Sequence, residues 1–167
     1  MHLLAHHPPV QELYRLFPSE RGFRIARSRQ AWPDLFYSKR IQLETLALAR
    51  ELREEIGRPL RIADPFCGVG PALATLLSEN DLVSDLLATD LNPDAVKLLM
   101  SNLSKWDRRT YPEGAIELQR IQENRLVGMA DALTLGDDSE IAGKWDLVLV
   151  NLPHRTIEFL PAIIPLL

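Results

Sequence analysis

Apolar positions along the chain recur with two different periods, and this pattern predicts helices alternating with short strands. A first helix is predicted to begin after Ser38, as N-cap, and to end at Gly57 and Pro59. The apolar face of this helix is expected to comprise Ile41, Leu48, Leu52 and Ile56. The next predicted element is LRIAD, residues 60–64, which has the length and composition of a buried strand.

The same pattern continues through the rest of the chain. Pro71 is expected to open a helix over 71–79, and Asn92 with Pro93 to cap and open another that ends at residue 106. Further strands are predicted over 85–90, 125–131 and 145–151, of which 125–131 has the weaker pattern and 145–151 the stronger. Residues 107–124 are ambiguous: Pro112 opens another helix through Ile121, or the stretch is a loop.

Strands separated by helices at this spacing predict an α/β fold with a mostly parallel, Rossmann-like sheet and helices on both faces. Each strand is followed or ended by a polar residue, namely Asp64, Asp90, Asp131 and Asn151. Ligands of such sheets bind beyond the carboxyl ends of the strands. A single acidic strand end is usually a turn or N-cap residue, so the recurrence is the informative feature.

The segment DPFCGVGP, residues 64–71, predicts a turn whose backbone approaches a ligand closely. Gly68 and Gly70 permit positive φ, and Asp64 can accept hydrogen bonds from an amino group. The third glycine of a dinucleotide fingerprint is missing, and the lysine of a P-loop is absent, so a pyrophosphate is not the expected ligand. Cys67, the single cysteine, is interpreted as a small residue in a tight turn.

A ligand with an amino-acid end and an adenosine end suits these residues better. Asp90 is placed to bind both ribose hydroxyls, and Asp131 to accept from the adenine amino group. The implied cofactor is S-adenosylmethionine. The alternative for Asp90, with Asn92 and Pro93 following it, is simple entry into a helix.

Four segments together resemble the class I S-adenosylmethionine methyltransferases of the tRNA guanine-37 N1-methyltransferase type. They are FYSKRIQLE, DPFCGVGP, ATDLNPDAVKLLMSNL and VLVNLPHRTIEFL, and the resemblance covers roughly residues 34–160. The two middle segments are shared by many class I methyltransferases and specify the cofactor. The Asn-Leu-Pro triplet and the Phe-Tyr-Ser-Lys-Arg segment, with lysine where the family has proline, are more specific.

The resemblance implies roles for individual residues. Glu44 matches the family's proton acceptor, Asn151 the residue that orients the base, and Arg40 would supply positive charge near guanine O6 or a phosphate. Pro153 would stiffen the loop that carries Asn151, and His154 would touch the base. The residues expected to hold the cofactor are Asp64, Phe66, Gly68, Gly70, Asp90, Asn92, Asp131 and Asn151. Without the resemblance, Glu44 reads as a solvated helix residue and His154 as an exposed loop residue.

Charge is distributed unevenly along the chain. The net charge is −4, yet the segment from Arg15 to Arg40 contains seven cations and only two acids. Aromatic residues interleave with these cations, so the block suits a phosphate backbone with unpaired bases; a solvated face paired with the acidic body is the alternative. We therefore expect residues 1–37 to be a basic segment that contacts tRNA, and residues 38–167 to be the cofactor-binding domain.

Several expectations complete the interpretation. No metal-ligand spacing, membrane span or signal peptide is evident, so a cytoplasmic protein is expected. Class I sheets continue beyond the fourth strand, so the domain is expected to be truncated at the apolar end TIEFLPAIIPLL. The alternatives are a partner that supplies the missing strands and a degenerate relative of the family. Two other functions stay open: methylation of an exocyclic RNA amino group or aminocarboxypropyl transfer, and a cofactor- or RNA-binding module without catalysis.

Overall fold

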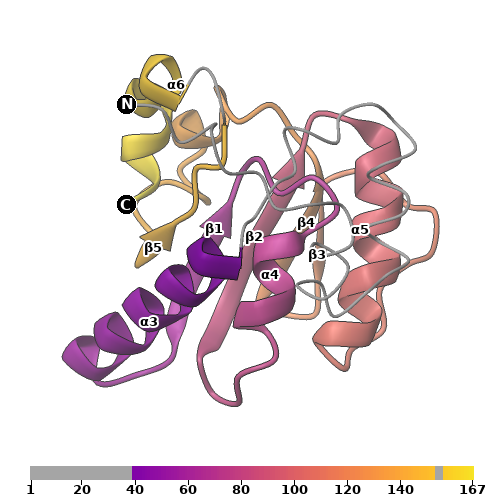
Figure 1. The fold of residues 1–167 in the computed structure, drawn as a ribbon. Helices are drawn as coiled ribbons and strands as arrows, with labels where there is room; N and C mark the ends of the chain where they lie inside the picture. The colour runs from indigo at the N-terminus through magenta and orange to yellow at the C-terminus, as the bar shows by residue number, and fades with distance from the viewer. Residues whose placement is uncertain (1–38, 153–155) are drawn as a thin grey trace.

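The computed structural model describes residues 39–152 and 156–167, with side chains from residue 42 onward. Its strands are β1 (Leu60–Asp64), β2 (Val83–Asp90), β3 (Gln119–Ile121), β4 (Arg125–Met129) and β5 (Leu147–Val148). They form one sheet in the order β3-β4-β2-β1-β5 (Figure 1). All pairs are parallel except β3 with β4, which confirms the predicted mostly parallel α/β sheet.

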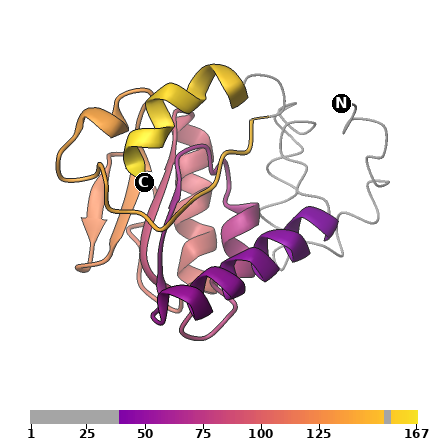
Figure 2. The same ribbon diagram turned by 90° about the vertical axis from the view of Figure 1, so that its left-hand side faces the viewer.

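Helical segments cover both faces of this sheet, as the alternation of elements predicts. The helices of the first face are α3 (Lys39–Ile56), α4 (Pro71–Leu76) and α5 (Pro93–Trp106). The second face is covered by η3 (Leu135–Asp137), α6 (Thr156–Ile163) and η4 (Ile164–Leu166). Figure 2 shows α6 across the upper end of the sheet and α3 crossing below it. None of the described helices is long and apolar enough to span a bilayer.

Side chains of the central strands alternate between the two cores. Leu60 and Ile62 of β1 pack among α3, α4 and α5, whereas Ala63 packs toward η3 and η4. Leu86 and Leu87 of β2 divide in the same way. These central strands read as continuous apolar runs because both of their faces are covered. Each fully buried Leu or Ile contributes about 1.5–3 kcal/mol to folding.

The buried face of α3 differs from the predicted one. Leu46 and Ala49 are buried, whereas Leu48 is 54% and Ile56 is 38% exposed. Leu52 packs against the core as predicted, whereas the prediction is wrong for Leu48 and Ile56, because apolar residues occur on more than one side of this helix. The helix does end at Gly57, which has φ +76° and donates its N–H to the carbonyl of Arg53 at 2.8 Å. Ser38, the predicted N-cap, lies outside the described residues.

Residues 107–124 do not form the helix that was one of the two expectations, and they are not entirely a loop either. Residues 119–121 form β3, which turns back antiparallel onto β4. The backbone of Glu117 and Leu118 runs so close to Gly128 that a Cβ there would lie 2.3 Å from the Glu117 carbonyl oxygen. A glycine within β4 therefore marks a close backbone approach, which explains why the sequence pattern of this strand is weak.

Three predicted elements are shorter than expected, and one of them is the strand predicted over 125–131, which ends at Met129. The helix that opens at Pro71 ends at Leu76 rather than at residue 79. The strand predicted over 145–151 pairs with β1 only through Leu147 and Val148, although Leu149 still donates its N–H to the Ala63 carbonyl at 2.8 Å. The apolar run continues beyond the ladder, so composition overestimates strand length here.

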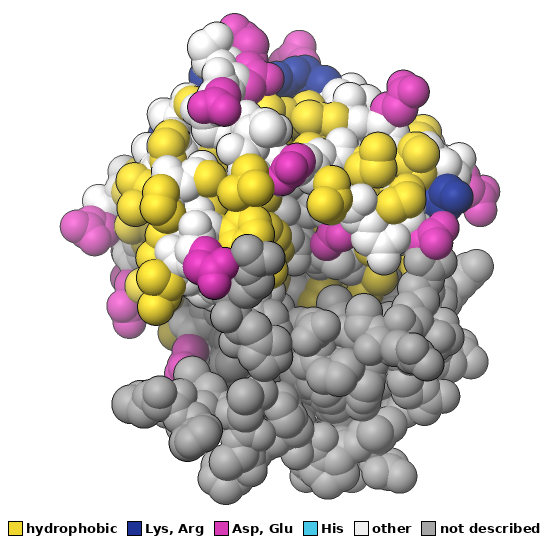
Figure 3. Space-filling view, turned by 90° about the horizontal axis from the view of Figure 1, so that it is seen from above, with side chains coloured by type: hydrophobic (Ala, Val, Ile, Leu, Met, Phe, Trp, Pro, Cys, Tyr) yellow, Lys and Arg dark blue, Asp and Glu magenta, His cyan; other side chains and the backbone are white. Residues whose placement is uncertain are grey.

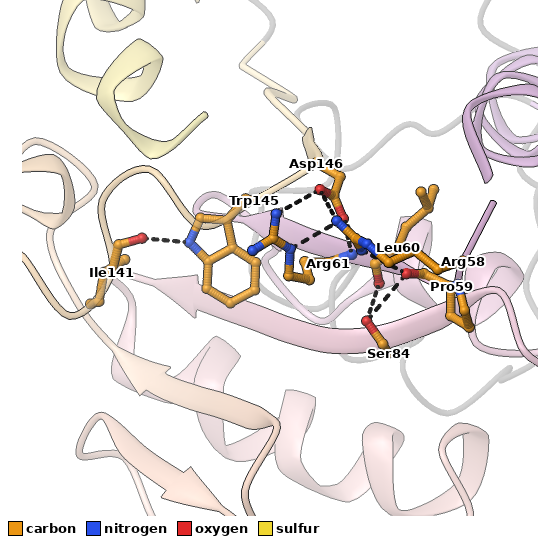
Figure 4. A network of polar contacts seen from close by, with 8 residues as sticks. All are labelled: Arg58, Pro59, Leu60, Arg61, Ser84, Ile141, Trp145 and Asp146. Carbon is orange, nitrogen blue, oxygen red and sulfur yellow. Dashed lines mark hydrogen bonds and ion pairs between the residues drawn. The ribbon is translucent and has the colours of Figure 1, made fainter. Parts of the chain in front are cut away.

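Charged side chains join the amino ends of β1 and β5 (Figure 4). Asp146 accepts from both Arg58 and Arg61, with nitrogen to oxygen distances of 2.8 Å in each pair. It also accepts the backbone N–H of Arg61 at 2.8 Å. The Arg58 and Arg61 guanidiniums and this N–H hold the pKa of Asp146 well below its usual range, against the opposing effect of burial.

A second charged network is buried beneath α5. Arg125 of β4 is 2% exposed and pairs with Asp107, which follows α5, through Nε at 2.8 Å and Nη2 at 3.0 Å. The Tyr111 hydroxyl donates to the same carboxylate at 2.6 Å, and Arg125 Nη1 donates to the Ser84 carbonyl. Burial and the neighbouring Asp107 carboxylate raise the pKa of Tyr111. This network fixes α5 and the loop after it against the amino ends of β2 and β4.

Candidate functional site at the carboxyl ends of the strands

The direction of chain progression through the sheet reverses at β1. From β1 the chain proceeds to β2 and then β4, and it returns to the opposite side of β1 as β5. Ligands of open α/β sheets bind at such a switch point, beyond the carboxyl ends of the strands. The residues at this edge are Asp64 at the end of β1, Asp90 at the end of β2, Asp131 after β4 and Asn151 after β5.

The glycine turn after β1 is tied directly to the end of β2. Asp90 accepts the backbone N–H of Gly68 at 2.8 Å through one oxygen and that of Asn92 at 2.8 Å through the other. Asn92 caps α5 by accepting from the Asp94 N–H at 3.0 Å. Burial raises the pKa of Asp90, while these two N–H groups oppose the shift. Asp90 therefore organises both the glycine turn and the entry into α5.

Gly70 has a conformation and surroundings that exclude a larger residue. Its φ is +85°, and a Cβ there would lie 2.8 Å from Leu99 Cδ1 and 3.0 Å from the Trp106 ring. Gly68 also has positive φ, at 55°. The two glycines thus permit the left-handed turn that the sequence predicts, and Gly70 additionally allows α4 to pack closely on α5.

Asp64 is the most unusual side chain of the described edge. It is 2% exposed, and within the described part of the chain no donor reaches its Oδ1. Burial raises the pKa of Asp64 to about 7, with a further contribution from the Asp90 carboxylate, although the Phe66 N–H opposes the shift. A buried carboxylate oxygen without a donor is costly for a fold, and strongly shifted acids cluster at functional sites.

Cys67 lies between these two carboxylates in the chain and is buried. Burial and the nearby Asp64 and Asp90 raise the pKa of its thiol well above the usual value. A thiol in such surroundings stays protonated and is a poor nucleophile. The structure therefore agrees with its interpretation as a small residue in a tight turn.

The glycine turn also contacts the segment after β5. The rings of Phe66 and Phe159 pack edge to face, with centroids 5.3 Å apart and planes at 86°. Thr156 donates its hydroxyl to the Leu152 carbonyl, which joins the start of α6 to the middle residue of the Asn-Leu-Pro triplet. Segments about ninety residues apart, DPFCGVGP and VLVNLPHRTIEFL, thus meet at one edge of the sheet.

Some of the other predicted site residues lie within the part of the chain that the structure describes, and others lie outside it. Asn151 is half-buried, and Asp131 is exposed and accepts the Leu133 N–H at 3.0 Å in a turn. Glu44 is exposed in the second turn of α3. The side chain of Arg40 lies outside the described residues, as do Pro153 and His154. The geometry brings Asp64, Phe66, Gly68, Gly70, Asp90 and Asn92 together at this edge, and the roles of all the predicted site residues stay predictions.

Three exposed apolar residues near the strand ends were missed by sequence reasoning. Leu91 is 66%, Met129 38% and Leu133 49% exposed, and Met129 lies opposite Asp90 in the ladder. Figure 3, which looks down on this end of the molecule, shows hydrophobic side chains beside acidic ones. Exposed apolar residues of this kind can pack against the face of an apolar ring. In the sequence, Leu91 follows Asp90, and Met129 and Leu133 lie on either side of Asp131. This proximity to acidic strand ends is the signal that could have found them.

Two further observations concern a pocket and possible metal sites. A pocket at the amino ends of the strands is lined by cations and acids together, among them Arg61, Asp85, Glu140 and Lys144. Its charges are mixed, and it lies at the opposite end of the sheet from Asp64. Among the described residues, no group of three or more His, Cys, Asp and Glu side chains is arranged to hold a metal ion.

Comparison with known proteins gives two related sequences. The tRNA (guanine(37)-N(1))-methyltransferase of Giardia intestinalis is 35% identical over 69 residues, which are 41% of this chain and 15% of that protein. The tRNA (guanine(37)-N(1))-methyltransferase Trm5b of Pyrococcus abyssi is 31% identical over 127 residues, which are 75% of this chain and 30% of that protein. The chain thus spans less than a third of either relative.

No protein-family model matches the chain, and no solved structure matches it significantly. The fold and the two related sequences nevertheless agree with the motifs at the strand ends. The chain has a Rossmann-like α/β sheet, and it resembles the tRNA (guanine-37-N1)-methyltransferases.

Proposed function

We propose that this chain binds S-adenosylmethionine at the carboxyl ends of β1, β2 and β4 and methylates N1 of a guanine in the tRNA anticodon loop. The observation that carries the cofactor is Asp64, whose buried Oδ1 has no donor in the described part of the chain. An ammonium group satisfies such an oxygen and compensates its buried charge. The names of the two related proteins support the substrate.

The described residues fit the parts of this cofactor. Asp64 would accept from its ammonium group, beside the turn of Phe66, Gly68 and Gly70, and Asp90 would accept from the ribose hydroxyls. Leu91, Met129 and Leu133 are exposed and would offer apolar contact to the adenine ring, and Asp131 would accept from its amino group. Asn92 holds the helix entry, and Asn151 borders the site at β5. When bound, the cofactor supplies a methyl group on positively charged sulfur, which passes to guanine N1 and leaves S-adenosylhomocysteine.

The chain's own residues prepare the guanine for this transfer. Glu44 accepts the N1 proton, which leaves the N1 lone pair free to form the new bond. Asn151 orients the base, because an amide both donates and accepts hydrogen bonds. Arg40 balances charge at O6 or a phosphate, while Pro153 and His154 complete the loop beside the base. An anticodon-loop base is already unpaired, so presenting it costs less than opening a duplex.

The division of labour along the chain is part of the proposal. Residues 38–167 bind the cofactor, and residues 1–37 contact tRNA through the cations of the basic block. Removal of residues 1–37 should weaken tRNA binding and reduce its salt dependence while leaving cofactor binding intact. Equal tRNA affinity and salt dependence with and without residues 1–37 would contradict this assignment.

Calorimetric titration with S-adenosylmethionine tests the cofactor first. Asp90→Ala should abolish binding, whereas Asp137→Ala, which removes an exposed carboxylate of η3, should leave it unchanged. Absence of binding by the folded wild-type chain would refute the proposal.

Methylation of tRNA transcripts with guanine or adenine at position 37 then tests the reaction. Nucleoside analysis of the product separates 1-methylguanosine, the expected product, from guanosine methylated on its amino group or carrying an aminocarboxypropyl group. Cofactor binding without any transfer would instead identify a binding module. Glu44→Gln should lower the rate with little effect on cofactor affinity, since its role is confined to the N1 proton.

A further inference from the structure

We infer that Asp64 is protonated in the free protein near neutral pH and gives up this proton when the cationic end of the cofactor binds. This inference rests on the proposed function, because it concerns the same site. It adds a property that the cofactor assignment does not require, namely that binding is coupled to proton release.

The geometry favours a neutral carboxyl in the absence of ligand. Asp64 is 2% exposed at the end of β1, and no donor reaches its Oδ1 in the described part of the chain. An ionised carboxylate so placed has lost its water without gaining a full set of partners. The pKa of Asp64, raised to about 7 by burial and by Asp90, agrees with this reading.

The charged and titratable groups around Asp64 are mostly acidic. Asp90 approaches from β2, the buried thiol of Cys67 lies in the glycine turn, and α4 contributes no titratable residue. On α6 Glu158 is exposed, and on α5 Asp94 pairs with Lys97 at 3.6 Å. None of these described groups supplies a cation to Asp64. Compared with the described part of the chain, a ligand ammonium would therefore be a new cationic partner for Asp64 and would favour its ionised form.

S-adenosylhomocysteine is a suitable probe, because it carries the ammonium group and is not consumed. At pH 6 its α-amino group is almost fully protonated, and a carboxyl with a pKa near 7 binds about 0.9 proton. Calorimetry at pH 6 in two buffers of different ionisation enthalpy should therefore show release of close to one proton per ligand bound. The dissociation constant should rise about tenfold between pH 8 and pH 6.

Two controls separate Asp64 from other groups. 5′-Methylthioadenosine, which lacks the amino-acid end, should bind the wild-type protein without releasing a proton. Asp64→Asn should bind S-adenosylhomocysteine without release and with an affinity independent of pH. Binding by the wild-type protein without proton release, or equal release by wild type and Asp64→Asn, would overturn the inference and leave the proposed function standing. Failure of both nucleosides to bind would refute the two together.

Discussion

Asp64 also makes a measurable prediction about stability without any ligand. Its pKa is about 7 in the folded chain, against 3.8 for an unperturbed aspartate. Because the folded state binds the proton more tightly than the unfolded state, this group destabilises the fold increasingly as the pH rises from about 4 to 7. At about 1.4 kcal/mol per pKa unit, the full effect is on the order of 4 kcal/mol above pH 7.

Replacement by asparagine isolates this contribution, because Asn has nearly the same shape and does not titrate. Between pH 5 and pH 8, the free energy of unfolding of the wild-type chain should fall by about 2.5 kcal/mol relative to Asp64→Asn. Most of this change should occur below pH 7, above which the two curves should become parallel. The absolute difference at any one pH includes the packing of the new amide, so only the pH dependence is diagnostic.

Urea unfolding followed by circular dichroism at pH 5, 6, 7 and 8 measures both proteins under identical conditions. Asp137→Asn, at an exposed position of η3, serves as the matched control and should run parallel to the wild-type curve. Parallel curves for wild type and Asp64→Asn would show that Asp64 titrates normally in the folded state. That result would refute the reasoning about its buried, unpaired oxygen.

Three further substitutions test other parts of the structure. Gly70→Ala should lower the free energy of unfolding by about 1–3 kcal/mol in urea titrations, because its Cβ would meet Leu99 and its φ is positive; an unchanged midpoint would contradict the packing described. Asp107→Ala should cost about 3–5 kcal/mol, since it leaves the Arg125 guanidinium buried without its carboxylate; a loss below 1 kcal/mol would show that the pair is dispensable. Asp146 has a lowered pKa, so its contribution is present above about pH 4 and lost as the pH falls below that value. The thermal midpoint of Asp146→Asn should therefore lie below that of wild type at pH 7, and the difference should be smaller at pH 3 without vanishing, because the folded-state pKa lies lower still; a constant difference would refute the assignment.

The fold was largely predictable because its main signals are local. The strand over 60–64, the helix start at Pro71 and the cap at Asn92 all depend on a few neighbouring residues. The buried side of α3 was not predictable, because leucines occur around the helix and only tertiary packing decides between Leu46 and Leu48. β3 was missed for a similar reason, since three residues become a strand only through pairing with β4.

The candidate site was predictable where it follows strand ends. The order of the strands could not be read from the sequence, yet parallel crossovers place every strand's carboxyl end at the same edge. That rule alone brought Asp64 and Asp90 together. The contact between Phe66 and Phe159 was not predictable, because it depends on how α6 packs across the sheet. The missing donor at Asp64 Oδ1 likewise appears only once the surrounding chain is in place.

The link between Asp146 and Arg61 has a consequence for the order in which the chain folds. These residues are 85 positions apart, whereas the β1 and β2 residues joined by the Ser84 hydroxyl are 24 apart. Closing the longer loop costs more chain entropy, and distant contacts slow folding. β1, α4 and β2 are therefore expected to assemble before β5 docks. Until then, the free edge of β1 is open to pairing with another chain, and the opposite charges of Asp146 and the two arginines favour the correct partner.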